Sequence, residues 1–378
     1  MGEISIRSAM FPLVRGLWKT RVVAGLHYLN GEPCFLYGNH SNNFDPFLVN
    51  WDVPLGHCSS GVLTAEFMQK GLIPAAFRSI GLLSTRKRVP EPHLVGRILR
   101  LLRAGRNVLI YPEGGRRWDG RPATWISSTA KLFSRTGVPV HPVITNGSYV
   151  AWPRWADWPR PARIEVTVLP AVDLSDISQT EEAVARLSAP IAQDENLPPP
   201  HLRPTWAFRP ADGIERLLYR DPVTGEHGGL FTEDGHRISN AARTMRWRML
   251  PDSRILDEES GEIHLTGDLY HRIRNLPLEP TSDGYLLHNH VTVLAGAGLG
   301  AMLDLGRGAV SLSRTHLRLK TLRMEETIGL EDVLYAGVER NYKLQITLRD
   351  RILELHFTSG GSALQWEDAF QILRPVDA

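Results

Sequence analysis

Short apolar runs alternate with amphipathic stretches over the first 170 residues of the chain. The runs at residues 33–37, 108–111 and 137–143 have the length of buried strands, and polar or glycine-rich turns bound them. Residues 94–104, with arginines along one face, and residues 127–135 have helical spacing instead. This alternation predicts an α/β domain in which helices flank a mixed sheet.

Residues 4–29 carry a different pattern. Met10, Phe11 and Leu17 fall close to one helical face, and basic residues lie beside that face. The pattern predicts an amphipathic N-terminal helix. Such a helix can lie in a membrane interface, but its apolar face can equally pack on the sheet, and the sequence leaves both open.

The second half of the chain follows a proline-rich stretch at residues 197–204, which we interpret as a linker. The predicted division is an α/β domain over residues 1–196, the linker, a small β-hairpin insert over residues 205–278, and a β domain over residues 279–378. In this last domain, alternating strands precede one amphipathic C-terminal helix, a pattern that resembles pleckstrin-homology and GRAM-type barrels. We expect the barrel to fold independently and to be dispensable for the chemistry.

The composition of the chain limits the number of domains and the cellular compartment that it fits. The chain has 378 residues, enough for two or three domains, and only two cysteines, which fits a reducing compartment without a disulfide framework. We find no signal peptide and no apolar run of about 18 residues that would predict a membrane span. The sequence thus favours a cytoplasmic protein.

Charge is unevenly spread. Residues 1–135 hold 18 Lys and Arg against 8 Asp and Glu, a net +10, whereas the remainder holds 25 against 33, a net −8. A basic first part suits anionic partners, such as an acyl carrier's phosphates, a lipid headgroup or an anionic bilayer. A solvated basic face with no partner is the alternative. We do not expect nucleic acid as a partner, because no nucleic-acid-binding module accompanies the charge.

The most informative motif follows the first apolar run. His40 stands five residues before Asp45, in an Asn-rich turn that should open a helix. If a carboxylate holds one ring nitrogen of a histidine, the other nitrogen can take a proton from an incoming hydroxyl. The alternative is a capping Asn/Asp pair around a histidine with no chemical role.

Three further segments follow this motif. Residues 81–86 form a strand-like run that ends in Arg86, residues 108–116 read Val-Leu-Ile-Tyr-Pro-Glu-Gly-Gly-Arg, and residues 137–143 read Gly-Val-Pro-Val-His-Pro-Val. In this order the four segments resemble the motif blocks of the glycerolipid acyltransferases, the family of the 1-acylglycerol-3-phosphate acyltransferases. The resemblance covers roughly residues 10–172.

The resemblance implies transfer of a fatty acyl group from a thioester donor, acyl-CoA or acyl carrier protein, to a hydroxyl of a lysophospholipid or related lipid. It implies His40 as the general base and Asp45 as the group that orients it, and it requires no metal or other cofactor. It also implies an acceptor-binding site drawn from the second and third blocks: Arg86, Glu113, Gly114, Gly115 and Arg116. We expect Glu113 to fix the arginines or an acceptor hydroxyl. Because no membrane span accompanies the basic, aromatic N-terminal half, we expect a peripheral location on the inner face of an anionic membrane.

Departures from the family pattern keep other functions open. Gly115 stands where the family usually has Thr, and the lysines of a Phe-Lys-Lys-Gly-Ala stretch are missing from residues 125–129. Arg117 and Arg121 could supply the lost positive charge. The departures leave the identity of the acceptor open. They also leave two alternatives to the enzyme: a catalytically inactive membrane- or lipid-binding adaptor, and a phospholipid transacylase.

Two smaller features lie outside these blocks. Trp152, Trp155 and Trp158 stand at three-residue spacing among prolines and arginines, which suits either a bilayer headgroup layer or a buried aromatic plug. His288 and His290 share a strand face, but no third ligand is adjacent in the sequence, so we expect surface or turn residues rather than a metal site.

Overall fold

The computed structural model describes residues 16–52, 59–64, 83–85, 92–297, 302–357 and 361–374. Its first part contains a seven-stranded sheet of order β1-β7-β6-β2-β5-β3-β4. The strands are β1 (Trp18–Ala24), β2 (Phe35–Gly38), β3 (Ser59–Thr64), β4 (Leu83–Thr85), β5 (Asn107–Ile110), β6 (Val140–Asn146) and β7 (Ala162–Val168). In this sheet β6 and β7 pair antiparallel and the other described neighbours pair parallel, so the predicted mixed sheet is confirmed.

Helices cover both faces of this sheet, because successive strand residues point to opposite sides. Phe35 and Tyr37 of β2 pack with residues of α4, α5 and α7, whereas Leu36 packs with Val49 of α2. The predicted helices at residues 94–104 and 127–135 are confirmed. The helical elements are α2 (Asp45–Asp52), α4 (Pro92–Arg103), α5 (Ser127–Thr136), α6 (Ser148–Ala151) and α7 (Thr180–Ser188), with 3-10 turns η1 (Leu26–Tyr28) and η4 (Ala189–Ile191).

The prediction of a helix over residues 4–29 is wrong from residue 18 onward, whereas residues 16 and 17 are helical. Residues 18–24 form β1, which pairs with β7 along almost its whole length. The segment is rich in β-branched residues, which favour strands. Trp18 is also buried, and its indole nitrogen donates to the carbonyl of Arg160 at 3.0 Å. Long-range pairing therefore overrides the helical spacing. Residues 1–15 lie outside the described residues.

The proline-rich stretch at residues 197–204 packs on the first domain. It forms the 3-10 turn η5 (Pro200–Leu202) against β7, and Leu202 is fully buried. After η6 (Ile214–Arg216), five antiparallel strands of order β12-β11-β10-β9-β8 form a sheet that is more extensive than the predicted hairpin. These elements are β8 (Leu230–Glu233), β9 (Arg237–Asn240), β10 (Trp247–Met249), β11 (Arg254–Asp257) and β12 (Ile263–Leu265), followed by α8 (Thr266–Arg274).

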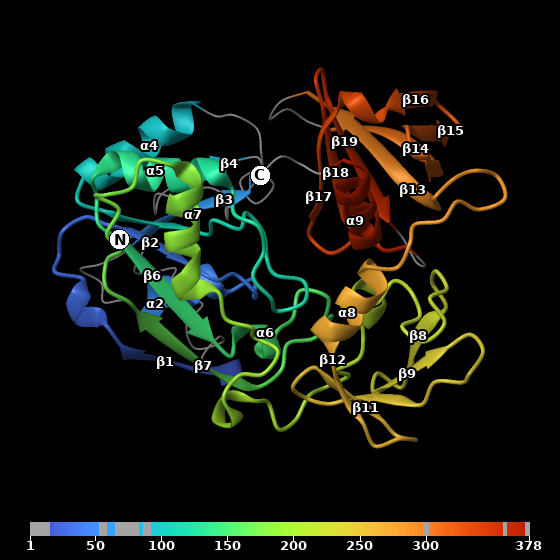
Figure 1. Ribbon diagram of the computed structural model, residues 1–378, viewed down its shortest axis with the longest axis horizontal. Helices are drawn as coiled ribbons and strands as arrows, with labels where there is room; N and C mark the ends of the chain where they lie inside the picture. Colours follow the sequence, from blue (N-terminus) through green and yellow to red (C-terminus); the bar gives the residue numbers. More distant parts are fainter. Residues whose placement is uncertain are drawn as a thin grey trace.

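The last part is a curled antiparallel half-barrel closed by α9 (Ala363–Leu373), with strand order β16-β15-β14-β13-β19-β18-β17 (Figure 1). The predicted strands and the predicted C-terminal helix are confirmed, and the resemblance to pleckstrin-homology domains stays a prediction. The strands are β13 (Leu287–Gly296), β14 (Leu303–Leu312), β15 (His316–Thr321), β16 (Glu325–Gly329), β17 (Val333–Glu339), β18 (Lys343–Leu348) and β19 (Ile352–Phe357), with the 3-10 turn η7 (Leu330–Asp332).

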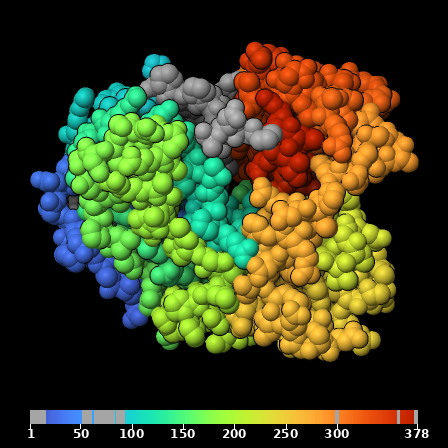
Figure 2. Space-filling model, in the orientation of Figure 1, coloured from blue at the N-terminus to red at the C-terminus, as the bar shows by residue number. Residues whose placement is uncertain are grey.

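One hydrophobic core joins the half-barrel to the first domain. Trp118 and Trp155 belong to the same buried cluster as Leu218, Ile255 and Trp366, which lie in the middle segment, the small sheet and α9. Figure 2 shows the teal segment around residue 120 between the green surface of the first domain and the orange and red surface of the C-terminal part. Because the half-barrel and the first domain share this core, the structure argues against a barrel that folds independently.

None of the helices in the described parts of the chain combines the length and the apolar character that crossing a bilayer requires.

Candidate active site

The carboxyl ends of β2, β5 and β6 meet at one edge of the sheet, because these strands are parallel neighbours. His40 follows β2, Glu113 follows β5 and Ser148 follows β6. Gly38 ends β2 where the strands approach closely: a Cβ at this position would lie 2.3 Å from the carbonyl oxygen of Val143. The topology thus gathers three segments that are far apart in the sequence.

His40 and Asp45 form the predicted contact. The imidazole Nδ1 lies 3.1 Å from Oδ2 of Asp45, which is fully buried. The same oxygen accepts hydrogen bonds from the backbone N–H groups of Ser41 and Asn42, both at 2.8 Å. Ser148 donates its hydroxyl to Oδ1. Four donors therefore fix one carboxylate, and the carboxylate fixes the imidazole.

The surroundings of His40 keep its imidazole neutral near pH 7. Burial lowers the pKa of His40, and the contact with Asp45 opposes this only in part. The ring stacks on Tyr111 with 4.3 Å between centroids. Because Nδ1–H faces the carboxylate, Nε2 carries the free lone pair, and a neutral imidazole in this tautomer can accept a proton.

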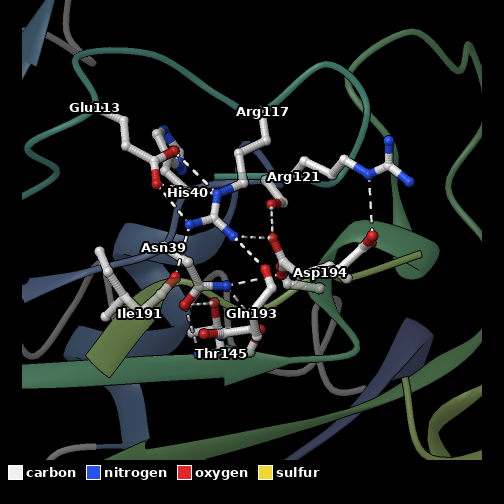
Figure 3. Close-up of polar contacts among 12 residues, drawn as sticks. Asn39, His40, Glu113, Arg117, Arg121, Thr145, Ile191, Gln193 and Asp194 are labelled. Carbon is white, nitrogen blue, oxygen red and sulfur yellow. Dashed lines mark hydrogen bonds and ion pairs between the residues drawn. The ribbon is translucent and has the colours of Figure 1, made fainter. Parts of the chain in front are cut away.

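A buried polar network lies behind His40, with Arg117 at its centre (Figure 3). The guanidinium of Arg117 donates to Glu113 at 2.6 Å, to Glu195 at 3.2 Å, and to the carbonyls of Ile191 and Gln193. The side chain is fully buried. The prediction that Arg117 supplies charge for a phosphate is therefore wrong, because internal carboxylates and carbonyls already occupy it. Arg121, the second substitute, ion-pairs with Asp194 and Asp268.

Glu195 connects this network to the turn that carries His40. It accepts hydrogen bonds from the Asn39 amide at 2.7 Å and from the Ser41 hydroxyl. Burial raises the pKa of Glu195 to about 7, against the opposing effect of Arg117. Sequence reasoning missed Glu195, since it stands between α7 and the proline-rich stretch without any periodic or motif signal.

The described residues of the predicted acceptor site do not form one group in the structure. Glu113 is buried against Arg117, so it does fix an arginine, but not Arg116. Gly114 adopts φ +68°, and a Cβ there would lie 2.5 Å from Ile126 Cδ1, while Gly115 is half-buried beside it. Arg86 lies outside the described residues.

Arg116 extends toward the half-barrel instead. Its guanidinium donates to Oδ1 of Asn341 at 3.0 Å. Arg154 lies next to it and donates to the Arg116 carbonyl at 2.8 Å. Burial, and then repulsion from Arg154, lower the pKa of Arg116 to about 9, and both guanidiniums contribute to the lowered pKa of His40. A positive zone therefore lies beside the imidazole.

Comparisons with known proteins agree with the geometry. Residues 20–146 match the family model described as Acyltransferase. This part of the chain, about a third of its length, is similar to acyltransferase domains. A 1-acyl-sn-glycerol-3-phosphate acyltransferase of Pseudomonas aeruginosa is 28% identical over 211 residues, which cover 49% of this chain and 79% of that protein. A protein of the same name from Limnanthes alba is 26% identical over 145 residues, 36% of this chain, and the chain spans about half of its length.

These relatives support an acyltransferase of the 1-acylglycerol-3-phosphate acyltransferase type. Among solved structures, that of the 1-acyl-sn-glycerophosphate acyltransferase from Thermotoga maritima matches with a TM-score of 0.43 and 18% identity, over 50% of this chain and 76% of that one.

The segment that carries Trp152, Trp155 and Trp158 is largely internal. Trp155 is fully buried, and its indole donates to the Tyr149 hydroxyl at 3.2 Å. Trp152 stacks on Phe44 with 5.9 Å between ring centroids. A membrane role is therefore wrong for Trp155, because its ring fills the core that joins the first domain to the following segments. Trp158, 46% exposed, is the member that reaches the surface.

In the described parts of the chain, no group of three or more His, Cys, Asp or Glu side chains is placed to hold a metal ion. His288 lies with Nδ1 2.9 Å from the Ser311 hydroxyl.

Proposed function

We propose that this protein transfers a fatty acyl group from a thioester donor to the hydroxyl of a lysophospholipid, with His40 as the general base. The observation that carries the proposal is the contact of the imidazole with buried Asp45, in a segment that matches the Acyltransferase family model, with no hydrogen-bond partner for Nε2 among the described residues. The names of the relatives make 1-acylglycerol 3-phosphate the acceptor to test first.

The chemistry follows from this arrangement. Nε2 takes the proton of the acceptor hydroxyl as its oxygen attacks the thioester carbonyl. The resulting tetrahedral oxyanion collapses and expels the thiolate, which receives the proton from the imidazolium. Asp45 stabilises that imidazolium. A positioned base of this kind raises the reaction rate roughly 10²–10⁴-fold. Backbone amides near Gly114 and Gly115 are candidates for oxyanion donors.

The acceptor's anionic headgroup would bind at Arg116, whose guanidinium lies in the positive zone beside His40. Arginine matches phosphate through paired N–H groups. The donor is acyl-CoA or acyl carrier protein, and the net +10 of residues 1–135 suits the phosphates of either.

We also propose that the protein acts as a peripheral protein on the cytoplasmic face of an anionic membrane. An exposed aromatic patch, formed by Trp158 at 46% and Phe208 at 49% exposure, supports this, and Trp206, two residues before Phe208 in the chain, is 60% exposed. Trp158 and Phe208 touch edge-on, with 5.3 Å between ring centroids. Exposed aromatic groups of this kind mark interaction surfaces and suit the headgroup layer.

Vesicle co-sedimentation tests the membrane proposal. The double variant Trp158→Ser and Trp206→Ser should bind phosphatidylglycerol vesicles more weakly than the wild type, and high salt should weaken binding of both proteins. The exposed Phe231, in β8, offers a matched control as Phe231→Ser. Binding that survives both the double substitution and high salt would exclude docking through this patch.

A donor screen tests the enzymatic proposal. The purified protein is incubated with lysophosphatidate and, in turn, oleoyl-CoA, oleoyl-acyl carrier protein or phosphatidylcholine, and phosphatidate is measured by mass spectrometry. Product should form with a thioester donor. Product from phosphatidylcholine alone would make the protein a transacylase, and no product from any donor or lysophospholipid tested would favour an inactive adaptor.

A further inference from the structure

The half-barrel reaches the positive zone beside His40 through one turn, residues 340–342 between β17 and β18. Asn341 accepts a hydrogen bond from Arg116 at 3.0 Å. The carbonyls of Val338 and Arg340 accept from Arg154 at 2.8 and 3.2 Å. Arg340 has φ +57°, a left-handed conformation that tightens the turn. Two arginines of the first domain are thus held by a segment that lies 184 to 225 residues further along the chain.

The partners of these arginines are neutral oxygens. Within the described ranges, neither Arg116 nor Arg154 forms an ion pair with a carboxylate, and each guanidinium donates to an amide or to backbone carbonyls. Arg154 is nearly buried and its guanidinium stands 4.2 Å from the Trp118 ring centroid. Glu367 and Glu339 attract Arg154, and Asp45 attracts Arg116, but none of these carboxylates forms an ion pair with either guanidinium in the described parts of the chain. Two adjacent, partly desolvated cations without a carboxylate in direct contact favour the arrival of an anion.

An amide is a suitable partner for an arginine that is to bind an anion. Asn341 fixes one nitrogen of the Arg116 guanidinium without neutralising its charge, so the remaining N–H groups can bind an external anion. Arg154 holds the backbone of Arg116 through a hydrogen bond to its carbonyl. A carboxylate at position 341 would hold the side chain equally well, but it would compete with the anion.

We propose that the β17–β18 turn is part of the acceptor site, and that Asn341 and Arg154 are positioning residues that hold Arg116 to bind the phosphate monoester of the acceptor. The proposal rests on the proposed function for the identity of the reaction. It gives the half-barrel a role in choosing the acceptor, whereas the base and its carboxylate belong to the first domain.

Steady-state kinetics with lysophosphatidate and oleoyl-CoA tests the proposal in the full chain. Asn341→Ala should raise the KM for lysophosphatidate roughly tenfold, because a charge-assisted contact is lost, and should leave kcat and the KM for oleoyl-CoA within about twofold. Asp350→Ala, in the exposed turn at the opposite end of β18, is the matched control and should match the wild type. An unchanged acceptor KM in Asn341→Ala, or a rise in the donor KM alone, would overturn the proposal.

Asn341→Asp separates anion binding from a merely structural contact. It keeps an oxygen for Arg116 but adds a competing charge, so the KM for lysophosphatidate should rise above that of Asn341→Ala. Monoacylglycerol, which lacks the phosphate, should not lose affinity. Recovery of the wild-type KM for lysophosphatidate in Asn341→Asp would show that the turn only supports the fold.

Direct binding keeps this test separate from catalysis. Calorimetry with His40→Ala protein should show lysophosphatidate binding that weakens roughly tenfold when Asn341→Ala is added. Binding of coenzyme A, the other source of a phosphate monoester, should not change. If the binding of coenzyme A weakens instead, the two arginines belong to the donor site. If His40→Ala remains active while the binding pattern holds, the proposed base fails and the anion site stands.

Discussion

Replacing Asp45 by Asn tests how much of the chemistry depends on one buried charge. The amide oxygen can take the place of Oδ2 and still accept from His40, Ser41 and Asn42. The amide nitrogen then faces the hydroxyl of Ser148, which can reverse its role and accept. The geometry should survive and only the charge should be lost.

The expected loss of turnover in Asp45→Asn follows from the contacts of the carboxylate. Hydrogen bonds to a charged acceptor are about twice as strong as neutral ones, so two backbone N–H groups lose about 1 kcal/mol each. That loss is offset in part because a charge is no longer buried. For the imidazolium, two unit charges about 4 Å apart interact by about 4 kcal/mol at an effective dielectric constant of 20. Turnover should therefore fall about 10³-fold in a folded protein.

The assay follows thiol release from oleoyl-CoA at saturating lysophosphatidate, with circular dichroism as the test of folding. Ser148→Ala, which removes the Oδ1 contact alone, is the control and should lose less than about tenfold. Because burial lowers the pKa of His40 and Asp45 opposes that shift, the acid limb of kcat/KM should lie below pH 6.5 and move lower still in Asp45→Asn. A folded Asp45→Asn protein with near-wild-type turnover, or an acid limb that moves upward, would refute this reasoning.

Three further predictions concern the fold. Arg117→Met leaves Glu113 and Glu195 buried without their cation and should lower the free energy of unfolding by about 3–5 kcal/mol, measured in urea at neutral pH; an unchanged midpoint would contradict the central place of this residue. Burial raises the pKa of Asp368 to about 7, so the folded protein favours the protonated carboxyl. The stability that this carboxyl contributes is fully present below its unfolded pKa and is lost as the pH rises through 7. Asp368→Asn should therefore gain stability relative to wild type between pH 5 and 8 in urea titrations, and a loss over that range would reverse the sign. Truncation after residue 196 should give insoluble or inactive protein, because Trp118 and Trp155 lose the other half of their core; soluble truncated protein with wild-type kinetics would restore the independent barrel.

The parts of the site that could be predicted from the sequence are local. His40 and Asp45 are five residues apart, and the strand before them is a continuous apolar run, so turn chemistry and strand length were enough to place both. The same holds for Glu113, which stands three residues after the end of β5, a second buried strand. Parallel strands then bring such segments to one edge without further information.

The parts that could not be predicted depend on packing between distant segments. Arg117 has the sequence context of an exposed cation. It becomes an internal group because the segment of residues 191–195, 74 to 78 residues away, joins Glu113 around its guanidinium. Residues 18–24 have helical spacing, and pairing with β7 makes them a strand. The contact of Arg116 with Asn341 crosses 225 residues and leaves no local signal.

The central claim, that His40 is the base of an acyl transfer, is tested most directly by the turnover of His40→Ala with oleoyl-CoA and lysophosphatidate. The variant should fold, bind lysophosphatidate with wild-type affinity, and form phosphatidate at least about 10²-fold more slowly than the wild type. Phosphatidate formed at the wild-type rate by folded His40→Ala protein would contradict the account.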